Sequence, residues 1–265
     1  MNFIDTHTHL FLKQFEDDID DVIEIAIRSG ITKMFLPNIS SETTDSMLQL
    51  CEKYPENCFA MMGLHPCDVK KETMEKELFH VEEMLEKEKF IAVGEIGLDL
   101  YWDKTTLEIQ KMAFEFQIEL AKKHKLPIVI HVRDSFEQAI EIVENLNDEN
   151  LSGVFHCFTG SVKLRRFCLD NEFYISLSGI VTFKNANQLR EVINSFPLQQ
   201  ILIETDSPFL APEPFRGKMN EPSYVKYISE YLSNFYNISH KEFNEITDNN
   251  FYNLFSKAIR YSEIS

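Results

Sequence analysis

Two histidines stand two residues apart near the amino terminus, in the run FIDTHTH at positions 3–9. Side chains alternate between the faces of a β-strand, so His7 and His9 would share one face. Two imidazoles placed in this way can hold a single divalent cation. Asp5 lies one step deeper on the same face, where we expect it to orient an imidazole. A hydrogen-bonded histidine pair without a ligand explains a lone His-x-His equally well.

Further polar residues recur at the carboxyl ends of other short apolar runs. They are His65, Glu95, His131, His156 and Asp206. With His7 and His9, this set takes five of the eight histidines in the chain. Histidines that served only core packing would not be expected to recur at the carboxyl ends of several apolar runs. The other three lie in helical, mixed-charge surroundings and are interpreted as surface residues: His80, His124 and His240.

Ligands of nitrogen and carboxylate oxygen without cysteine suit Zn²⁺ or Mn²⁺, and Mg²⁺ when waters complete its shell. We expect two divalent cations that share the carboxylate of Glu95. The six ligands divide into two overlapping sets, which are His7, His9, Glu95 and Asp206, and then Glu95, His131 and His156. Two cations about 3.5 to 4 Å apart activate water and stabilise attacking and leaving oxygens. Asp206 is placed to accept the proton of that water.

Arg133 shares a strand face with His131, which would bring a guanidinium beside the metals. Guanidinium groups recognise phosphate through two parallel hydrogen bonds, so an anionic phosphoester is the favoured substrate. A salt bridge from Arg133 to Asp134 or Glu137 is an equally good interpretation. Asp99 is interpreted as a loop carboxylate.

The overall charge, taken alone, argues against binding of nucleic acid. The 265 residues carry 26 Lys and Arg against 43 Asp and Glu, a formal charge of −17. Two divalent cations would nevertheless turn the six-ligand cluster positive, and charges beyond about 8 to 10 Å are largely screened. We therefore expect work on DNA ends or single strands rather than tight binding of duplex DNA.

The elements that must position these residues alternate between short apolar strands and amphipathic helices. The predicted strands cover residues 3–5, 33–37, 59–64, 91–94, 128–132, 153–155, 173–177 and 201–203. Residues 17–29 and 105–124 have helical periodicity, and residues 224–265 are expected to form two further helices. Strands that are apolar on both faces favour a parallel sheet covered by helices.

Eight such units of about 33 residues match a (β/α)8 TIM barrel, whose carboxyl-end face carries the active site. A doubly wound open sheet is the alternative, but no Gly-x-Gly-x-x-Gly follows the first strand. We find no linker or repeat, so a single domain over residues 1–265 with extra carboxyl-terminal helices is expected. No apolar run is long enough to cross a membrane. Five cysteines without a Cys-x-x-Cys pair favour reduced thiols and a cytoplasmic location.

As a set, seven motifs of this chain resemble the TatD family of metal-dependent hydrolases, in the family's order. They are FIDTHTH (3–9), GLHP (63–66), GEIGLD (94–99), PIVIHVR (127–133), FHCFTG (155–160), ETDSP (204–208) and RGKMNEP (216–222). The resemblance implies an amidohydrolase-superfamily barrel and a divalent-metal DNase, in several members a 3′ to 5′ exonuclease. It places the metal ligands on the same six residues.

The same resemblance implies which residues contact the substrate. His65 matches a family histidine that contacts substrate, and Arg133 matches a segment lining the cleft. The loop of residues 216–222 also lines the cleft, which makes three more residues candidates for substrate binding: Arg216, Lys218 and Asn220. The family position that corresponds to Met219 is often basic, so one phosphate contact differs here.

Two other functions remain open at this point. The superfamily also cleaves amides, lactones and phosphotriesters, and some TatD-like proteins are linked to removing D-amino acids from tRNA. A lysine available for carboxylation on the fourth strand would favour the amide branch, but Glu95 takes that place. A non-catalytic metal or protein-binding module is the third reading, and no segment points to an obligate protein partner. We expect a deoxyribonuclease, with Asp206 and Glu95 as its catalytic carboxylates.

Overall fold

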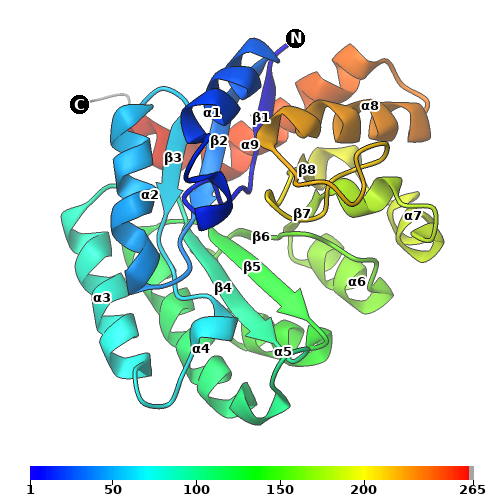
Figure 1. Ribbon diagram of the computed structural model, residues 1–265. Helices are drawn as coiled ribbons and strands as arrows, with labels where there is room; N and C mark the ends of the chain where they lie inside the picture. The colour runs from blue at the N-terminus through cyan, green and yellow to red at the C-terminus, as the bar shows by residue number, and fades with distance from the viewer. Residues whose placement is uncertain (263–265) are drawn as a thin grey trace.

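Short parallel strands lie at the centre of the molecule, and helices surround them (Figure 1). The structure is a computed structural model that describes the backbone of residues 1–262 and the side chains of residues 1–255. In that part of the chain the strands are β1 Phe3–Asp5, β2 Ile31–Pro37, β3 Cys58–Met61, β4 Val93–Asp99, β5 Ile128–Arg133, β6 Gly153–Phe155, β7 Tyr174–Leu177 and β8 Ile201–Ile203. All eight overlap a predicted strand.

Helices follow the strands along the chain and form the outer layer (Figure 1). They are α1 Ile19–Arg28, α2 Ser41–Lys53, α3 Met74–Lys87, α4 Leu107–His124, α5 Phe136–Leu146, α6 Val162–Asp170, α7 Asn187–Ile193, α8 Val225–Phe235 and α9 His240–Ser262. The helices predicted over residues 17–29 and 105–124 correspond to α1 and α4. The two helices predicted over residues 224–265 correspond to α8 and α9, and residues 263–265 of that prediction lie outside the described residues.

The strands pair as parallel neighbours in two sheets, β1-β2-β3 and β4-β5-β6-β7-β8. Single parallel bridges join the sheets at both seams, Met62 to Val93 and Thr8 to Ser207. One backbone hydrogen bond at each seam illustrates the contact: Gly94 donates to the Met62 carbonyl at 2.9 Å, and His9 to the Ser207 carbonyl at 2.8 Å. The ring of neighbours is that of a TIM-barrel-like α/β fold.

Burial of the strands is the expected consequence of parallel pairing, because the crossover helices between parallel strands cover both faces of the sheet. Every residue of β1, β4, β6 and β8 is buried, as expected for strands that are covered on both faces. At the amino-terminal end, α9 closes the ring: Asn250 donates to the carbonyls of Leu198 and Ile201 at 2.6 and 2.8 Å. The carboxyl ends of the strands are the opposite end, where the predicted ligands gather.

The largest departure from the predicted strands is at β4. We expected residues 91–94, but the strand runs to Asp99, and Gly97 and Asp99 pair with His131 and Arg133 of β5. Gly97 permits this, because a Cβ there would lie 2.1 Å from the His131 carbonyl oxygen, and its φ is +140°. The interpretation of Asp99 as a loop carboxylate is therefore wrong; Asp99 is a buried strand residue.

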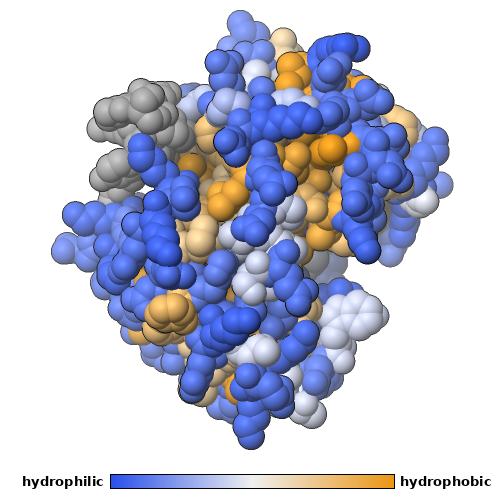
Figure 2. Space-filling view, turned by 60° about the vertical axis from the view of Figure 1, so that its left-hand side comes forward, coloured by the Kyte–Doolittle hydropathy of each residue, from blue (hydrophilic) through white to orange (hydrophobic). Residues whose placement is uncertain are grey.

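Hydrophilic side chains cover most of the face shown in Figure 2, and apolar side chains gather in its upper half. This agrees with a sequence in which 26% of the residues are charged. Among the described residues, no helix is both long and apolar enough to cross a membrane.

Candidate metal centre

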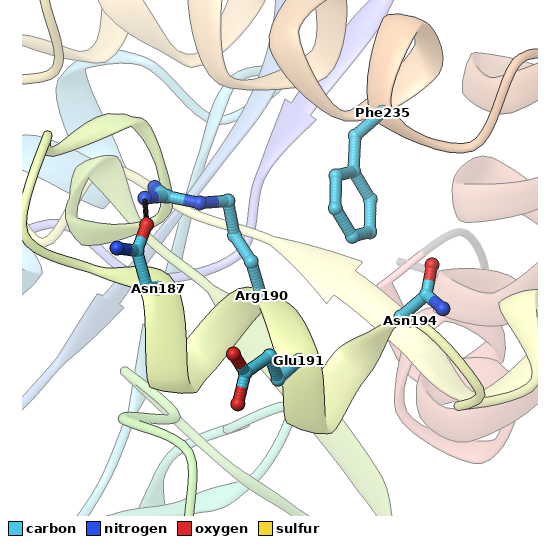
Figure 3. A pocket seen from close by; sticks show the side chains of 5 residues that line it. All are labelled: Asn187, Arg190, Glu191, Asn194 and Phe235. Atoms are coloured by element: carbon cyan, nitrogen blue, oxygen red, sulfur yellow. Dashed lines mark hydrogen bonds between the residues drawn. The ribbon is translucent and has the colours of Figure 1, made fainter.

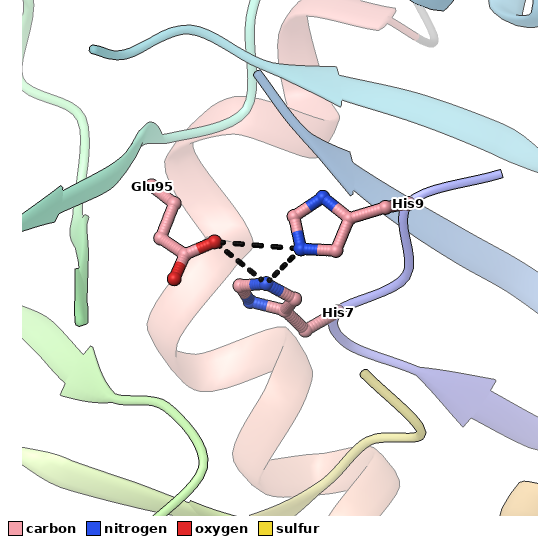
Figure 4. Close-up of side chains that lie close together, drawn as sticks. All are labelled: His7, His9 and Glu95. Atoms are coloured by element: carbon pink, nitrogen blue, oxygen red, sulfur yellow. Dashed lines mark hydrogen bonds and ion pairs between the residues drawn. The ribbon is translucent and has the colours of Figure 1, made fainter. Parts of the chain in front are cut away.

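Two histidines that follow β1 and a glutamate within β4 point toward one another (Figure 4). The Nε2 atom of His7 lies 3.1 Å from Oε2 of Glu95, and Nε2 of His9 lies 3.5 Å from the same oxygen. The two Nε2 atoms are 3.2 Å apart. Three potential metal-ligand atoms thus converge on one point, and all three residues are buried.

The other carboxylate oxygen of Glu95 faces a second pair of histidines. Nδ1 of His131, within β5, lies 2.7 Å from Oε1 of Glu95, and Nε2 of His156, directly after β6, lies 2.8 Å from it. These two imidazole nitrogens are 3.2 Å apart. The two oxygens of Glu95 therefore face different histidines, Oε2 those that follow β1 and Oε1 those of β5 and β6.

Asp206 completes the first of these two groups from the loop after β8. Its Oδ1 atom lies 3.6 Å from Nε2 of His9 and 3.8 Å from Nε2 of His7. The backbone NH of Asp206 donates to the His7 carbonyl at 2.9 Å, which holds the loop against β1. The side chain is 13% exposed, compared with 2% for Glu95. Asp206 is therefore the more accessible carboxylate of the two.

The donor set fits a divalent cation. The Nδ1 atoms of His7 and His9 are buried and lack a hydrogen-bond partner, while their Nε2 atoms crowd Oε2 of Glu95. Burial lowers the pKa of His7, and the neighbouring His156 adds to this, so His7 favours its neutral, ligating form. Lone pairs that converge in this way repel one another unless a cation lies between them.

The carboxylate of Glu95 attracts positive charge within the cluster. Burial would raise the pKa of Glu95, but His156, His65 and His7 hold it well below its usual range. For His156, burial acts to lower the pKa, and Glu95 and Glu204 together raise it well above the ordinary value. Glu95 is therefore ionised, which is the state in which a carboxylate binds a metal ion.

Two further carboxylates support the ligands from behind. Oδ2 of Asp99 lies 2.9 Å from Nε2 of His131, and Oε1 of Glu204 lies 3.4 Å from Nδ1 of His156. Glu204 also accepts a hydrogen bond from the Cys157 NH at 2.6 Å. The hydrogen bond with Asp99 fixes the orientation of the His131 imidazole, whereas Glu204 faces His156 as an ion pair without a hydrogen bond to Nδ1. We had assigned no role to Glu204, although its place beside Asp206 at the end of an apolar strand was a usable signal.

Asp5 does not act in the predicted way. Its carboxylate accepts hydrogen bonds from the Thr205 NH at 2.8 Å, the Thr205 hydroxyl at 2.5 Å and the His7 NH at 3.4 Å. Burial raises the pKa of Asp5 to about 8. Asp5 thus joins the ends of β1 and β8 through the backbone, and the prediction that it orients an imidazole is wrong.

The residues predicted to contact substrate separate into two groups. His65 belongs to the cluster itself, because its Nε2 atom lies 3.2 Å from Oε1 of Glu95. Arg133 is exposed and stacks on Tyr101, with the guanidinium carbon 3.6 Å from the ring centroid. This contact replaces the alternative salt bridge to Asp134 or Glu137.

The loop after β8 supplies the remaining predicted contacts. Arg216 and Lys218 are exposed, and each lies over an aromatic ring, with the Arg216 guanidinium carbon 4.2 Å from the Phe183 centroid. Asn220 is fully buried and donates to the carbonyls of Thr205 and Phe209 at 2.8 and 2.6 Å. Its amide therefore holds the loop, and its prediction as a substrate contact is wrong in this structure.

The histidines outside the cluster are not simple surface residues. His80 and His240 are half-buried and hydrogen-bonded to hydroxyl groups, at 2.9 Å to Thr44 and 3.0 Å to Ser229.

A hollow between α7 and α8 is separate from the cluster (Figure 3). Its lining residues are Asn187, Arg190, Glu191, Asn194 and Phe235. Arg190 already donates to the carbonyls of Val181 and Phe183 there, so we assign this hollow no function.

A ring of parallel strands with a histidine and carboxylate cluster at its carboxyl end defines the class of metal-binding β/α-barrel proteins. The chain belongs to the TatD related DNase family, whose sequence profile matches residues 4–256. This confirms the resemblance seen in the motifs.

Individual proteins that are similar to this chain over nearly its whole length agree with this family assignment. The chain is 41% identical over 251 residues to YabD of Bacillus subtilis, an uncharacterized metal-dependent hydrolase, covering 95% of this chain and 98% of that protein. It is 33% identical over 263 residues to YcfH of Escherichia coli, which bears the same description, covering 96% of both chains. The crystal structure of YjjV, a TatD homologue of E. coli, superposes with a TM-score of 0.89 at 30% identity and covers 96% of this chain and 98% of that one. The protein is a metal-dependent hydrolase.

Proposed function

We propose that this hydrolase cleaves phosphodiester bonds in DNA with two divalent metal ions, acting at single strands or ends in the 3′ to 5′ direction. The observation that carries the proposal is the division of Glu95 between two imidazole pairs, at 3.1 and 2.7 Å for the nearest atoms. Paired cations joined by one carboxylate are typical of enzymes that displace oxygen from phosphorus. Mg²⁺, Mn²⁺ and Zn²⁺ are the candidate ions.

Asp206 and Glu95 have different roles in such a reaction. Two divalent cations held here would make a bound water more acidic and stabilise negative charge on the phosphate. Burial would raise the pKa of Asp206, but its contacts with His9 and His7 hold it below the usual range. Asp206 is therefore ionised and partly exposed, and it accepts the proton of the attacking water. Glu95 stays deprotonated and fixes the distance between its two histidine pairs.

Surface charge supports an anionic substrate that is not a long duplex. The exposed cations lie at the carboxyl ends of two strands: Arg133 is the last residue of β5, and Arg216 and Lys218 belong to the segment that follows β8. The protein as a whole carries a formal charge of −17, which disfavours an extended phosphate backbone over the rest of the surface. A single strand that enters by its end needs contact only with the mouth of the barrel.

The test is nucleotide release from labelled single-stranded DNA by protein stripped of metal and then reloaded with Mg²⁺, Mn²⁺ or Zn²⁺. We expect no release in chelator, recovery on reloading, and loss in His131→Ala. The matched control is His80→Ala, a half-buried histidine outside the cluster. A block on the 3′ end should stop the reaction, whereas a block on the 5′ end should not.

Two outcomes would contradict the proposal. One is full DNA cleavage in chelator. The other is hydrolysis of a lactone or of D-aminoacyl-tRNA at matched metal, with no nucleotide released from DNA. The second result would assign the same centre to another class of ester.

A further inference from the structure

We propose that exposed aromatic side chains on two sides of the metal centre stack the bases of an unpaired DNA strand. Tyr101 and Trp102 form one side, and Phe209 forms the other. The inference rests on the proposed function and narrows its substrate to strands whose bases are free to stack. None of these three side chains was among the site residues that the sequence predicted.

The first side is tied to a metal ligand by hydrogen bonds. The backbone NH of Tyr101 donates to Oδ1 of Asp99 at 2.9 Å, and Oδ2 of the same carboxylate lies 2.9 Å from Nε2 of His131. Tyr101 is 52% exposed and Trp102 is 73% exposed, with their ring centroids 5.0 Å apart. The carboxylate of Asp99 thus contacts both the imidazole of His131 and the backbone at Tyr101, where the pair of exposed rings begins.

Arg133 adds a positive charge to this side. β4 and β5 end side by side (Figure 1), and Asp99 pairs with Arg133 in the strand register. The Arg133 guanidinium carbon lies 3.6 Å from the centroid of Tyr101 and 5.9 Å from that of Trp102. A guanidinium stacked on an aromatic ring keeps its edge free for a phosphate. Tyr101, Trp102 and Arg133 together therefore offer a surface for base stacking and a contact for a phosphate.

The second side lies against His9, in the first ligand set. The ring of Phe209 is 47% exposed, and its centroid lies 6.4 Å from that of His9. The Phe209 NH donates to the carbonyl of Asp206 at 2.9 Å, and its own carbonyl accepts from Asn220 at 2.6 Å. These bonds join Phe209 to a metal ligand on one side and to the buried Asn220 on the other.

Stacking on exposed rings explains why unpaired strands would be selected. In a duplex each base has both faces covered by its neighbours, whereas an unpaired base can stack on an aromatic side chain. Each such stack contributes about 5- to 150-fold to binding, as judged from alanine substitution. Tyr101 and Trp102 form a contiguous exposed aromatic patch, and such a patch marks an interaction site where an isolated exposed ring does not.

The chain contains a single tryptophan, Trp102, so its fluorescence reports on one surface. The probe is phosphorothioate oligothymidylate, which resists hydrolysis, compared in Mg²⁺ with an abasic phosphorothioate strand of the same length. We expect the base-bearing strand to quench the tryptophan and the abasic strand not to do so. Quenching by both strands, or by neither, would overturn the inference.

Binding of labelled strands, measured by anisotropy, completes the test. We expect Trp102→Ala and Phe209→Ala each to weaken binding of the base-bearing strand by about 5- to 150-fold, with no change for the abasic strand. Trp102→Phe should restore most of the loss. The control is Phe79→Ala, which removes a 65% exposed ring on α3 and should have no effect.

Equal binding by Trp102→Ala and the wild-type protein would overturn the stacking surface, even if DNA is hydrolysed. Base-dependent binding without any hydrolysis would instead refute the proposed function and leave the stacking surface standing. The two failures are therefore distinguishable.

Discussion

Replacing Asp99 with asparagine tests whether this buried carboxylate supports a metal ligand. Asp99 is buried, and its Oδ2 atom lies 2.9 Å from Nε2 of His131. Burial opposes ionisation, but the bonds with His131 and the Tyr101 NH lower the pKa of Asp99 to about 2. The carboxylate is therefore charged at neutral pH, and asparagine removes that charge with little change in volume.

The expected loss follows from the role of a carboxylate behind a ligating histidine. Removing such a partner costs about 10- to 100-fold in metal affinity, or roughly 1.4 to 2.8 kcal/mol. Only one of the two proposed sites should weaken, the one that contains His131 and His156. The site that contains His7 and His9 has no contact with Asp99 and should keep its affinity.

Titration of metal-stripped protein with Mn²⁺ or Zn²⁺ against a competing chelator measures both affinities. The matched control is Asp103→Asn, an exposed acid whose carboxylate accepts from Thr105 and not from the cluster. Wild-type affinity at both sites in Asp99→Asn would refute the reasoning. So would an equal loss at both sites, because that result would indicate a general disturbance of the barrel end.

Three other predictions concern stability and are read from unfolding experiments. Gly97→Ala should lower the free energy of unfolding by more than about 2 kcal/mol, because its Cβ would meet the His131 carbonyl at 2.1 Å; an unchanged melting temperature would contradict this. Burial raises the pKa of Asp248 to about 6, despite its bond with Asn244, so its contribution to stability is lost as pH rises from about 4 to 6. Asp248→Asn should therefore add about 1 kcal/mol at pH 7 and nothing at pH 3, and a gain at both pH values would contradict it. Phe251→Ala removes a fully buried ring that packs against Phe35, with the two ring centroids 4.6 Å apart. It should lower the free energy of unfolding, measured in denaturant, by about 3 to 5 kcal/mol. A decrease of less than about 1 kcal/mol would contradict full burial.

The sequence predicted the ring of strands and the convergence of its ligands because both depend on local patterns. Strand alternation predicted a shared face for His7 and His9, which converge in the structure although both follow the end of β1, and Glu95, His131 and Asp206 follow or occupy apolar runs. In a parallel barrel all such ends meet, so no long-range information was needed.

The supporting residues depended on pairings that no local pattern contains. Asp99 became a strand residue only because β4 continues through Gly97 beside β5. Asp5 bonds to Thr205, two hundred positions away in the chain, instead of a neighbouring imidazole. Asn220 matched a cleft-lining motif, but its side-chain amide donates its hydrogen bonds to backbone carbonyls of the same loop.

The most direct measurement is the electron paramagnetic resonance spectrum of the protein loaded with Mn²⁺, together with the number of ions bound per chain. If Glu95 bridges two cations through its separate oxygens, two Mn²⁺ ions per chain should give a spin-coupled signal. That coupling should disappear in Glu95→Ala and persist in His80→Ala. A single uncoupled Mn²⁺ ion per chain in the wild-type protein would contradict the bridged two-metal centre.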